Sequence, residues 1–119
     1  MVKPLLFKSL IIFLIITISN ADENRTLFFG NCIACHGDFG KQSAPHLIEV
    51  KGYYMMKYPK KDDFIRELSS WVFKPNRDKA LLKNEIKKYN LMPYLGIDLN
   101  TLQKIATYIY ENDDFGGLR

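Results

Sequence analysis

The sequence predicts an all-α protein, and three observations lead to that prediction. Apolar residues recur at positions i, i+1, i+4, i+7 and i+8 over residues 62–73, which is the spacing of one helix face. A second apolar stripe of helical spacing follows over residues 100–109. No segment alternates apolar and polar residues as a half-buried strand would, and no internal repeat is visible. We therefore expect helices joined by turns, without a sheet.

Residues 1–21 have the pattern of a secretory signal peptide. Two lysines precede an apolar run over residues 10–18, and Ser-Asn-Ala at 19–21 is a small-x-small site, so cleavage is expected after Ala21. The alternative is an uncleaved membrane anchor. Even counted from Leu5, the apolar run holds about fourteen residues, whereas a spanning helix needs roughly 20. We expect an exported mature chain with no stable membrane span, which would be membrane-anchored only if the signal is retained.

The charge of the chain gives no support to a nucleic-acid partner. The formal net charge is +4, and loss of the signal-peptide lysines, Lys3 and Lys8, lowers it to +2. No element interleaves basic and aromatic side chains as nucleic-acid-binding surfaces do. The basic character therefore comes partly from the targeting segment, and we expect no nucleic-acid binding.

The first half of the mature chain is expected to hold one helix and a long loop. Residues 23–32 indicate a short helix in which Phe28 lies on the same face as Cys32, four residues later. Residues 37–52 contain three glycines and Pro45, with few periodic apolar positions, so this stretch is expected to be loop.

The second half is expected to hold three helices. Helices are predicted over 62–73 and, with a more polar pattern, over 76–89. A turn-rich connector should follow over 90–96. The last helix is expected to start at Asn100, with Gln103 at the reciprocal capping-box position, and to fray near Asn112. Its expected buried face consists of Leu102, Ile105, Ala106, Tyr108 and Ile109.

The strongest chemical signal is Cys32-Ile33-Ala34-Cys35-His36. The chain has two cysteines and two histidines, and this segment holds both cysteines and one of the histidines. The C-x-x-C-H spacing is the attachment pattern of c-type haem. Each thiol adds across one haem vinyl group to give a thioether, and the adjacent imidazole becomes an axial ligand of the iron. One helical turn can place all three groups on a single porphyrin, so the motif predicts one covalently attached haem c.

With this motif in view, the chain resembles the class I cytochromes c, which are small, exported, single-haem electron carriers. Four features match in order: an N-terminal helix ending in the haem motif, a Pro-x-Leu loop at Pro45, a Met-Pro pair at Met92, and a C-terminal helix. The resemblance spans residues 22–112, which we take as the cytochrome c domain, and leaves 113–119 as a C-terminal tail. It implies four or five helices around one haem, with the N- and C-terminal helices packed together.

The resemblance also implies roles for individual residues. His36 would be the proximal and Met92 the distal iron ligand. The carbonyl of Pro45 would accept the second imidazole N–H of His36, which fixes the orientation of a ligating histidine. Leu47 would pack against the haem, and Phe28 would contact Ile105 and Tyr108. The expected cofactor-binding residues are therefore Cys32, Cys35, His36, Pro45, Leu47 and Met92, with His36 and Met92 on the metal.

Three side chains have more than one interpretation. Met92 could instead fill a gap in the core, since methionine adapts to irregular packing, and Met56 is the alternative sixth ligand. His46 lies next to Pro45, beside the proximal ligand, so a surface or haem-edge position fits it better than distal ligation. Trp71 either touches the haem or supplies apolar area with one polar end.

These observations lead to three functional hypotheses. The first is a periplasmic electron carrier that passes single electrons between redox protein partners and binds no small-molecule substrate. The second is a haem-carrying electron-transfer subunit of a larger oxidoreductase complex. The third is a haem-free zinc or thiol protein, with Cys32, Cys35, His36 and His46 as possible zinc ligands, although the usual second ligand pair is missing. An enzyme in the strict sense is not expected, because no nucleophile–base pair or open metal site can be assembled.

Overall fold

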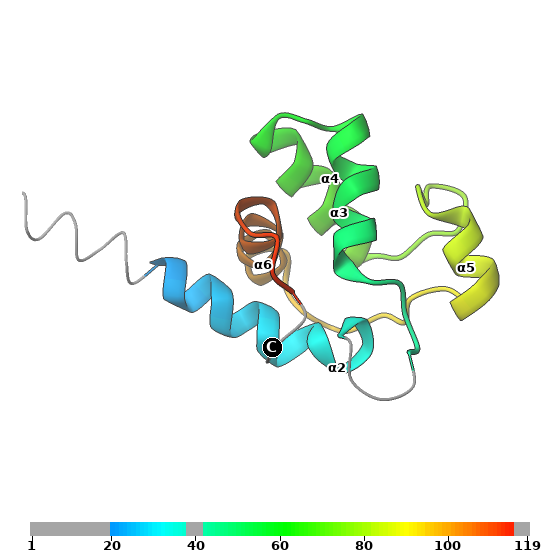
Figure 1. The fold of residues 1–119 in the computed structure, drawn as a ribbon, viewed down its shortest axis with the longest axis horizontal. Coiled ribbons are helices and arrows are strands. Elements are labelled where there is room, and N and C mark those ends of the chain that lie inside the picture. The colour runs from blue at the N-terminus through cyan, green and yellow to red at the C-terminus, as the bar shows by residue number, and fades with distance from the viewer. Residues whose placement is uncertain (1–19, 38–41, 116–119) are drawn as a thin grey trace, which may run out of the picture.

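The computed structural model describes residues 20–37 and 42–115, and within these ranges every regular element is a helix. The all-α prediction is thereby confirmed for the described part of the chain. Residues 20–31 are helical and continue after a turn at Cys32 into a short helix. The later elements, shown in Figure 1, are α2 (Ile33–His36), α3 (Leu47–Lys57), α4 (Lys61–Phe73), α5 (Lys83–Tyr89) and α6 (Leu99–Glu111).

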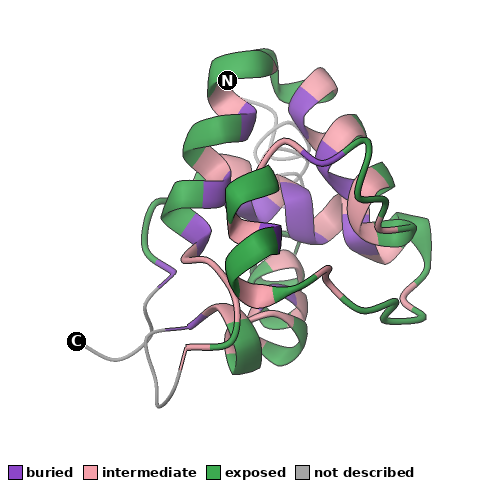
Figure 2. Cartoon of the chain, turned by 90° about the vertical axis from the view of Figure 1, so that its right-hand side faces the viewer, coloured by how far each residue is buried: buried purple, intermediate pink, exposed green. Residues whose placement is uncertain are grey.

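Helix α6 is the centre of the fold. It packs most extensively against α4, and α3 contacts both of them. In Figure 1 the N-terminal helical segment and α2 run past one side of α6, while α5 lies on the far side of α3. The five residues predicted for the buried face of α6 are all at most 8% exposed. Figure 2 shows the same pattern throughout, with buried residues on the inner sides of the helices.

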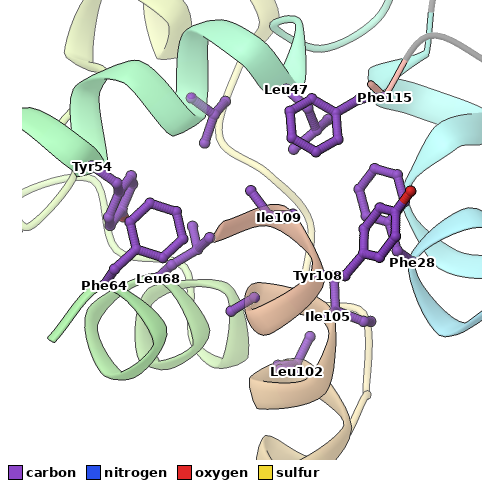
Figure 3. Packing of buried hydrophobic residues seen from close by; sticks show 12 residues of the cluster. Phe28, Leu47, Tyr54, Phe64, Leu68, Leu102, Ile105, Tyr108, Ile109 and Phe115 are labelled. Carbon is purple, nitrogen blue, oxygen red and sulfur yellow. The ribbon is translucent and has the colours of Figure 1, made fainter. Parts of the chain in front are cut away.

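An aromatic cluster joins the N-terminal helix to α6 and to Phe115. The ring of Phe28 is fully buried and stacks on Tyr108 of α6, with 4.8 Å between centroids. Phe115 approaches the same ring to 5.5 Å. Figure 3 shows Phe28, Tyr108 and Phe115 grouped at one side of α6, with Ile105 below Tyr108. The predicted packing of the N-terminal helix against the C-terminal helix is therefore present.

A second aromatic cluster lies at the other side of α6. Phe64 of α4 contacts Tyr54 of α3 and Tyr110 of α6, with ring centroids 6.1 Å and 5.2 Å apart. Figure 3 shows Tyr54 and Phe64 well away from Phe28, with Leu68 next to them. The core therefore extends across α6 from one aromatic cluster to the other.

The prediction that 37–52 is entirely loop was wrong, because α3 begins at Leu47. Leu47, Val50 and Tyr54 are buried on one face of α3 at helical spacing. Gly52 lies on the opposite, exposed face, where its weak helix propensity is outweighed by the packing of the inner face. A tertiary contact surface thus stabilises a helix that the local composition does not favour.

The two later helices begin at different residues from those predicted. The helix expected over 76–89 starts only at Lys83, because Asn76 Oδ1 accepts the backbone N–H groups of Asp78 and Lys79 and closes a turn. The last helix starts at Leu99. Its N-cap is Asp98, whose carboxylate accepts the backbone N–H of Thr101 at 2.9 Å, so the predicted Asn100 start was wrong.

The boundary between domain and tail also differs from the prediction. Phe115 was assigned to the tail 113–119, yet its side chain is 5% exposed and belongs to the core. Lys51 Nζ donates hydrogen bonds to the carbonyl oxygen of Asn112 and to Asp113 Oδ1, each at 2.7 Å. The folded unit therefore continues through residue 115.

The N-terminal prediction falls largely outside the described residues. The expected signal peptide covers 1–21, of which only residues 20 and 21 are described, both within the first helix. Among the helices of the described ranges, none is both long enough and apolar enough to cross a membrane. Signal cleavage after Ala21 stays a prediction.

Candidate functional site

A large pocket opens between the N-terminal helix, α3, the connector before α6, and α6 itself. It holds about 1290 Å³ of space not filled by protein atoms, counting the part open to solvent. Most of its lining is apolar and comes from every helix that follows the motif. The apolar side chains include Val50, Leu68, Val72, Ile86, Leu102, Ile105, Ala106 and Ile109. Such a lining suits a large, mostly apolar ligand.

Cys32, Cys35 and His36 all line this pocket. Helical backbone hydrogen bonds continue through the turn, from Cys32 N to the carbonyl of Phe28 and from His36 N to the carbonyl of Cys32, both 3.0 Å long. Because the chain stays helical, residues three and four positions apart share one face. The local helical geometry therefore brings the two thiols and the imidazole to one wall of the pocket, as the motif spacing predicted.

Both cysteines are free thiols, so no disulfide closes the motif. Cys32 is half-buried, and its burial, together with the nearby Cys35, raises the pKa of the Cys32 thiol to about 12. Cys35 is exposed. The buried thiol is therefore protonated at neutral pH, unlike the low-pKa thiolates of dithiol redox enzymes.

His36 is oriented by a hydrogen bond between its Nδ1 and the carbonyl oxygen of Pro45, 2.7 Å apart. A carbonyl can only accept, so Nδ1 carries the proton and Nε2 keeps a lone pair for a metal. Burial lowers the pKa of His36, while the Pro45 hydrogen bond acts in the opposite direction. The predicted contact between His36 and Pro45 is present, and it leaves the lone pair of Nε2 as the one that can bind a metal.

Met92 shares the pocket with His36, whereas Met56 does not line it. Met92 lies in the connector between α5 and α6, where Asn90 and Gly96 both have φ of 70°. Asparagine and glycine tolerate this left-handed conformation best, so they can shape the loop at both ends. The side chain of Met56 is 83% exposed on α3. Of the two methionines that the sequence left as alternatives, Met92 lines the pocket and Met56 does not.

The remaining predicted residues divide into two groups. Pro45, Leu47 and Trp71 line the pocket, and Trp71 Nε1 also donates a 2.9 Å hydrogen bond to the carbonyl of Asn76. His46 is not among the lining residues and instead precedes the first residue of α3 as its N-cap residue.

Sequence reasoning missed the lining residues Leu91, Leu95 and Ile97. They flank Met92 in the run from 91 to 97, which carries no charge although 25% of the chain is charged. That uncharged run is the signal that could have identified them.

The side chains weighed as zinc ligands do not form a metal cluster. Across residues 20–37 and 42–115, no group of three or more histidine, cysteine, aspartate or glutamate side chains is close enough to hold a metal ion. Tetrahedral structural zinc sites use four such ligands. Cys32, Cys35, His36 and His46 therefore do not come together as a zinc site.

Comparison with known proteins adds no family assignment. No protein-family model matches this chain, and neither a curated protein nor a solved structure does.

Proposed function

We propose that this protein is an exported monohaem c-type cytochrome that transfers single electrons between redox protein partners. The proposal includes the class I cytochrome c fold and a periplasmic location. One observation supports it most strongly: Cys32, Cys35, His36 and Met92 line the same apolar pocket. Met92 is distant from the motif in sequence, so helical spacing alone does not account for its position.

Each of the four residues has a distinct role in this proposal. Cys32 and Cys35 would hold the haem through two thioether bonds. His36 Nε2 and the Met92 sulfur would bind the iron, and the carbonyl of Pro45 fixes the tautomer and orientation of the His36 ring. The bound haem supplies an iron couple that takes up and releases one electron, and methionine ligation raises its potential.

The ligand set favours a carrier over a catalyst. If His36 Nε2 and the Met92 sulfur both bound the iron, a substrate would have to displace one of them to reach it. The apolar lining, including Leu47 and the central residues of α6, would limit the entry of water around a haem bound there. We therefore propose that the protein meets only other redox proteins as partners and has no small-molecule substrate.

A second proposal is that the protein is a haem-carrying subunit of a larger oxidoreductase complex. Tyr94 and Leu95, which follow Met92 and Pro93 in the connector, are 71% and 40% exposed. Exposed apolar side chains next to a binding pocket are typical of surfaces that a protein partner covers. Recovery of the chain at a constant stoichiometric ratio with one other protein would favour this proposal over a free carrier.

The test compares two methionines by optical spectroscopy of the exported protein. The wild type and Met56→Ala should both carry covalent haem on a denaturing gel and give a sharp low-spin spectrum when reduced. Met92→Ala should keep the covalent haem, lose the low-spin spectrum and bind carbon monoxide, because its sixth position is open. Met56→Ala is the matched control, since it removes an exposed methionine outside the pocket.

Three results would contradict the proposal. The wild type without covalent haem would exclude a c-type cytochrome. A high-spin wild-type spectrum, or ready carbon monoxide binding by the reduced wild type, would exclude methionine ligation. A low-spin spectrum lost in Met56→Ala but kept in Met92→Ala would show that Met56, and not Met92, is the iron ligand.

A further inference from the structure

The outward face of α3 carries three large apolar side chains that are exposed to solvent. Its large apolar side chains are 52% exposed at Ile48, 51% at Tyr53 and 83% at Met56. Ile48, Gly52 and Met56 are spaced by four residues and so form one line along the helix. We define the α3 outward face as Ile48, Glu49, Gly52, Tyr53, Met56 and Lys57, and none of these six residues lines the pocket.

Gly52 lies at the middle of this face. A Cβ atom at Gly52 would meet nothing within 4 Å, and its backbone is ordinary helix, so no contact inside the chain requires a glycine. Glycine within a helix is unfavourable relative to alanine. What glycine does provide is room for another helix to approach the backbone closely. The position therefore suits a helix that crosses α3 at Gly52.

The α3 outward face carries one acidic and one basic residue, at opposite ends of the helix. Glu49 lies in the first turn of α3 and Lys57 in its last turn, with Tyr53 midway between them on the same flank. Within the chain, Glu49 also interacts electrostatically with Lys88 of α5, and Lys57 Nζ lies 5.6 Å from the ring centre of Tyr58. An acidic residue at one end and a basic residue at the other make the face complementary to its own antiparallel copy.

We propose that the α3 outward face binds the same face of a second copy of this chain, as an antiparallel helix pair about a twofold axis. With the axis between Gly52 and Tyr53, Glu49 of each copy lies opposite Lys57 of the other. The same axis brings Ile48 of each copy next to Met56 of the other. Twofold symmetry repeats every contact, as in isologous dimers.

The size of the face determines the strength of this dimer. One face of an 11-residue helix buries far less than the roughly 1,600 Å² of a standard stable interface. We therefore expect a weak dimer, with a dissociation constant between about 1 µM and about 1 mM. Binding of an unrelated partner would not require Glu49 and Lys57 to lie at opposite ends of the face, whereas pairing with a second copy does.

Sedimentation velocity of the full exported protein, from about 1 µM to about 1 mM, tests the proposal. The wild type should shift from monomer to dimer as concentration rises. Glu49→Lys and Lys57→Glu should each weaken dimerisation about tenfold or more, because each places two pairs of like charges in the contact. The double variant Glu49→Lys/Lys57→Glu should dimerise again, and an equal mixture of the two single variants should form heterodimers.

Two further variants separate dimerisation from folding. Gly52→Ala should raise the thermal midpoint of the monomer and weaken the dimer. Misfolding would lower the thermal midpoint, so it cannot produce this combination. Asp78→Lys makes the same charge change as Glu49→Lys at an exposed position outside α3, and it should leave dimerisation unchanged.

Several outcomes would overturn the proposal. These are a wild type that stays monomeric throughout, single reversals that dimerise like the wild type, and a folded double variant that fails to dimerise. Since the face is separate from the pocket, these outcomes are independent of the haem spectrum and leave the proposed function unaffected.

Discussion

Truncation of Phe28 should destabilise the fold more than truncation of an exposed phenylalanine. Phe28 is fully buried, and its ring lies 4.8 Å from Tyr108, 5.1 Å from Phe29 and 5.5 Å from Phe115. Replacing a buried phenylalanine by alanine costs about 3–5 kcal/mol in free energy of unfolding, through lost burial and the remaining cavity. Because small domains have only about 5–15 kcal/mol in total, Phe28→Ala should remove a large fraction of the stability.

Urea denaturation followed by far-ultraviolet circular dichroism measures this loss. The matched control is Phe73→Ala at the end of α4, where the side chain is 40% exposed. We expect about 4 kcal/mol for Phe28→Ala and less than about 1 kcal/mol for Phe73→Ala. Equal losses in both variants, or a loss below about 1 kcal/mol for Phe28→Ala, would refute the view that Phe28 anchors the N-terminal helix to α6.

Two other substitutions test local features of the fold. Gly30→Ala should raise the free energy of unfolding by about 0.5–1 kcal/mol, because a Cβ there meets nothing within 4 Å and alanine favours the helix more than glycine does. A lower free energy of unfolding, measured by urea denaturation, would contradict this expectation. Asp98→Ala should lower the thermal midpoint at neutral pH, because hydrogen bonds from Thr101 lower the pKa of the Asp98 carboxyl. That stabilisation is fully present above the ordinary pKa of 3.8 and is lost as pH falls through the lowered value, so the midpoints of variant and wild type should converge in acid. A difference that stays constant down to the acid limit of folding would contradict this role of Asp98.

The helices with strong apolar periodicity were predictable, and those stabilised mainly by tertiary contacts were not. α4 and α6 have wide apolar stripes, and both were predicted to within a residue or two. α3 was missed because Gly52 and the preceding glycines suggested a loop, while its helical state depends on the burial of Leu47, Val50 and Tyr54. Phe115 was assigned to a tail because nothing in its local sequence indicates the contact with Phe28.

The candidate site divides in the same way. The common wall formed by Cys32, Cys35 and His36 follows from helical spacing, which is a local property of the chain. The contact between His36 and Pro45 was expected from the resemblance and is present at 2.7 Å. The apolar residues around Met92 were not predicted. The uncharged run 91–97 marks them as apolar, but their place in the pocket depends on how distant segments pack.

The helical class, the spacing of the two thiols and the imidazole, and the small set of methionines able to face them can all be read from the amino-acid order. Folding was needed to show which methionine shares the pocket with His36, how far the core extends, and that Ile48, Tyr53 and Met56 of α3 are exposed. The difference comes from the range of the forces. Hydrogen bonds within a helix act between residues three or four positions apart and can be read locally. Burial depends on segments distant in sequence, and these meet only when the chain has folded.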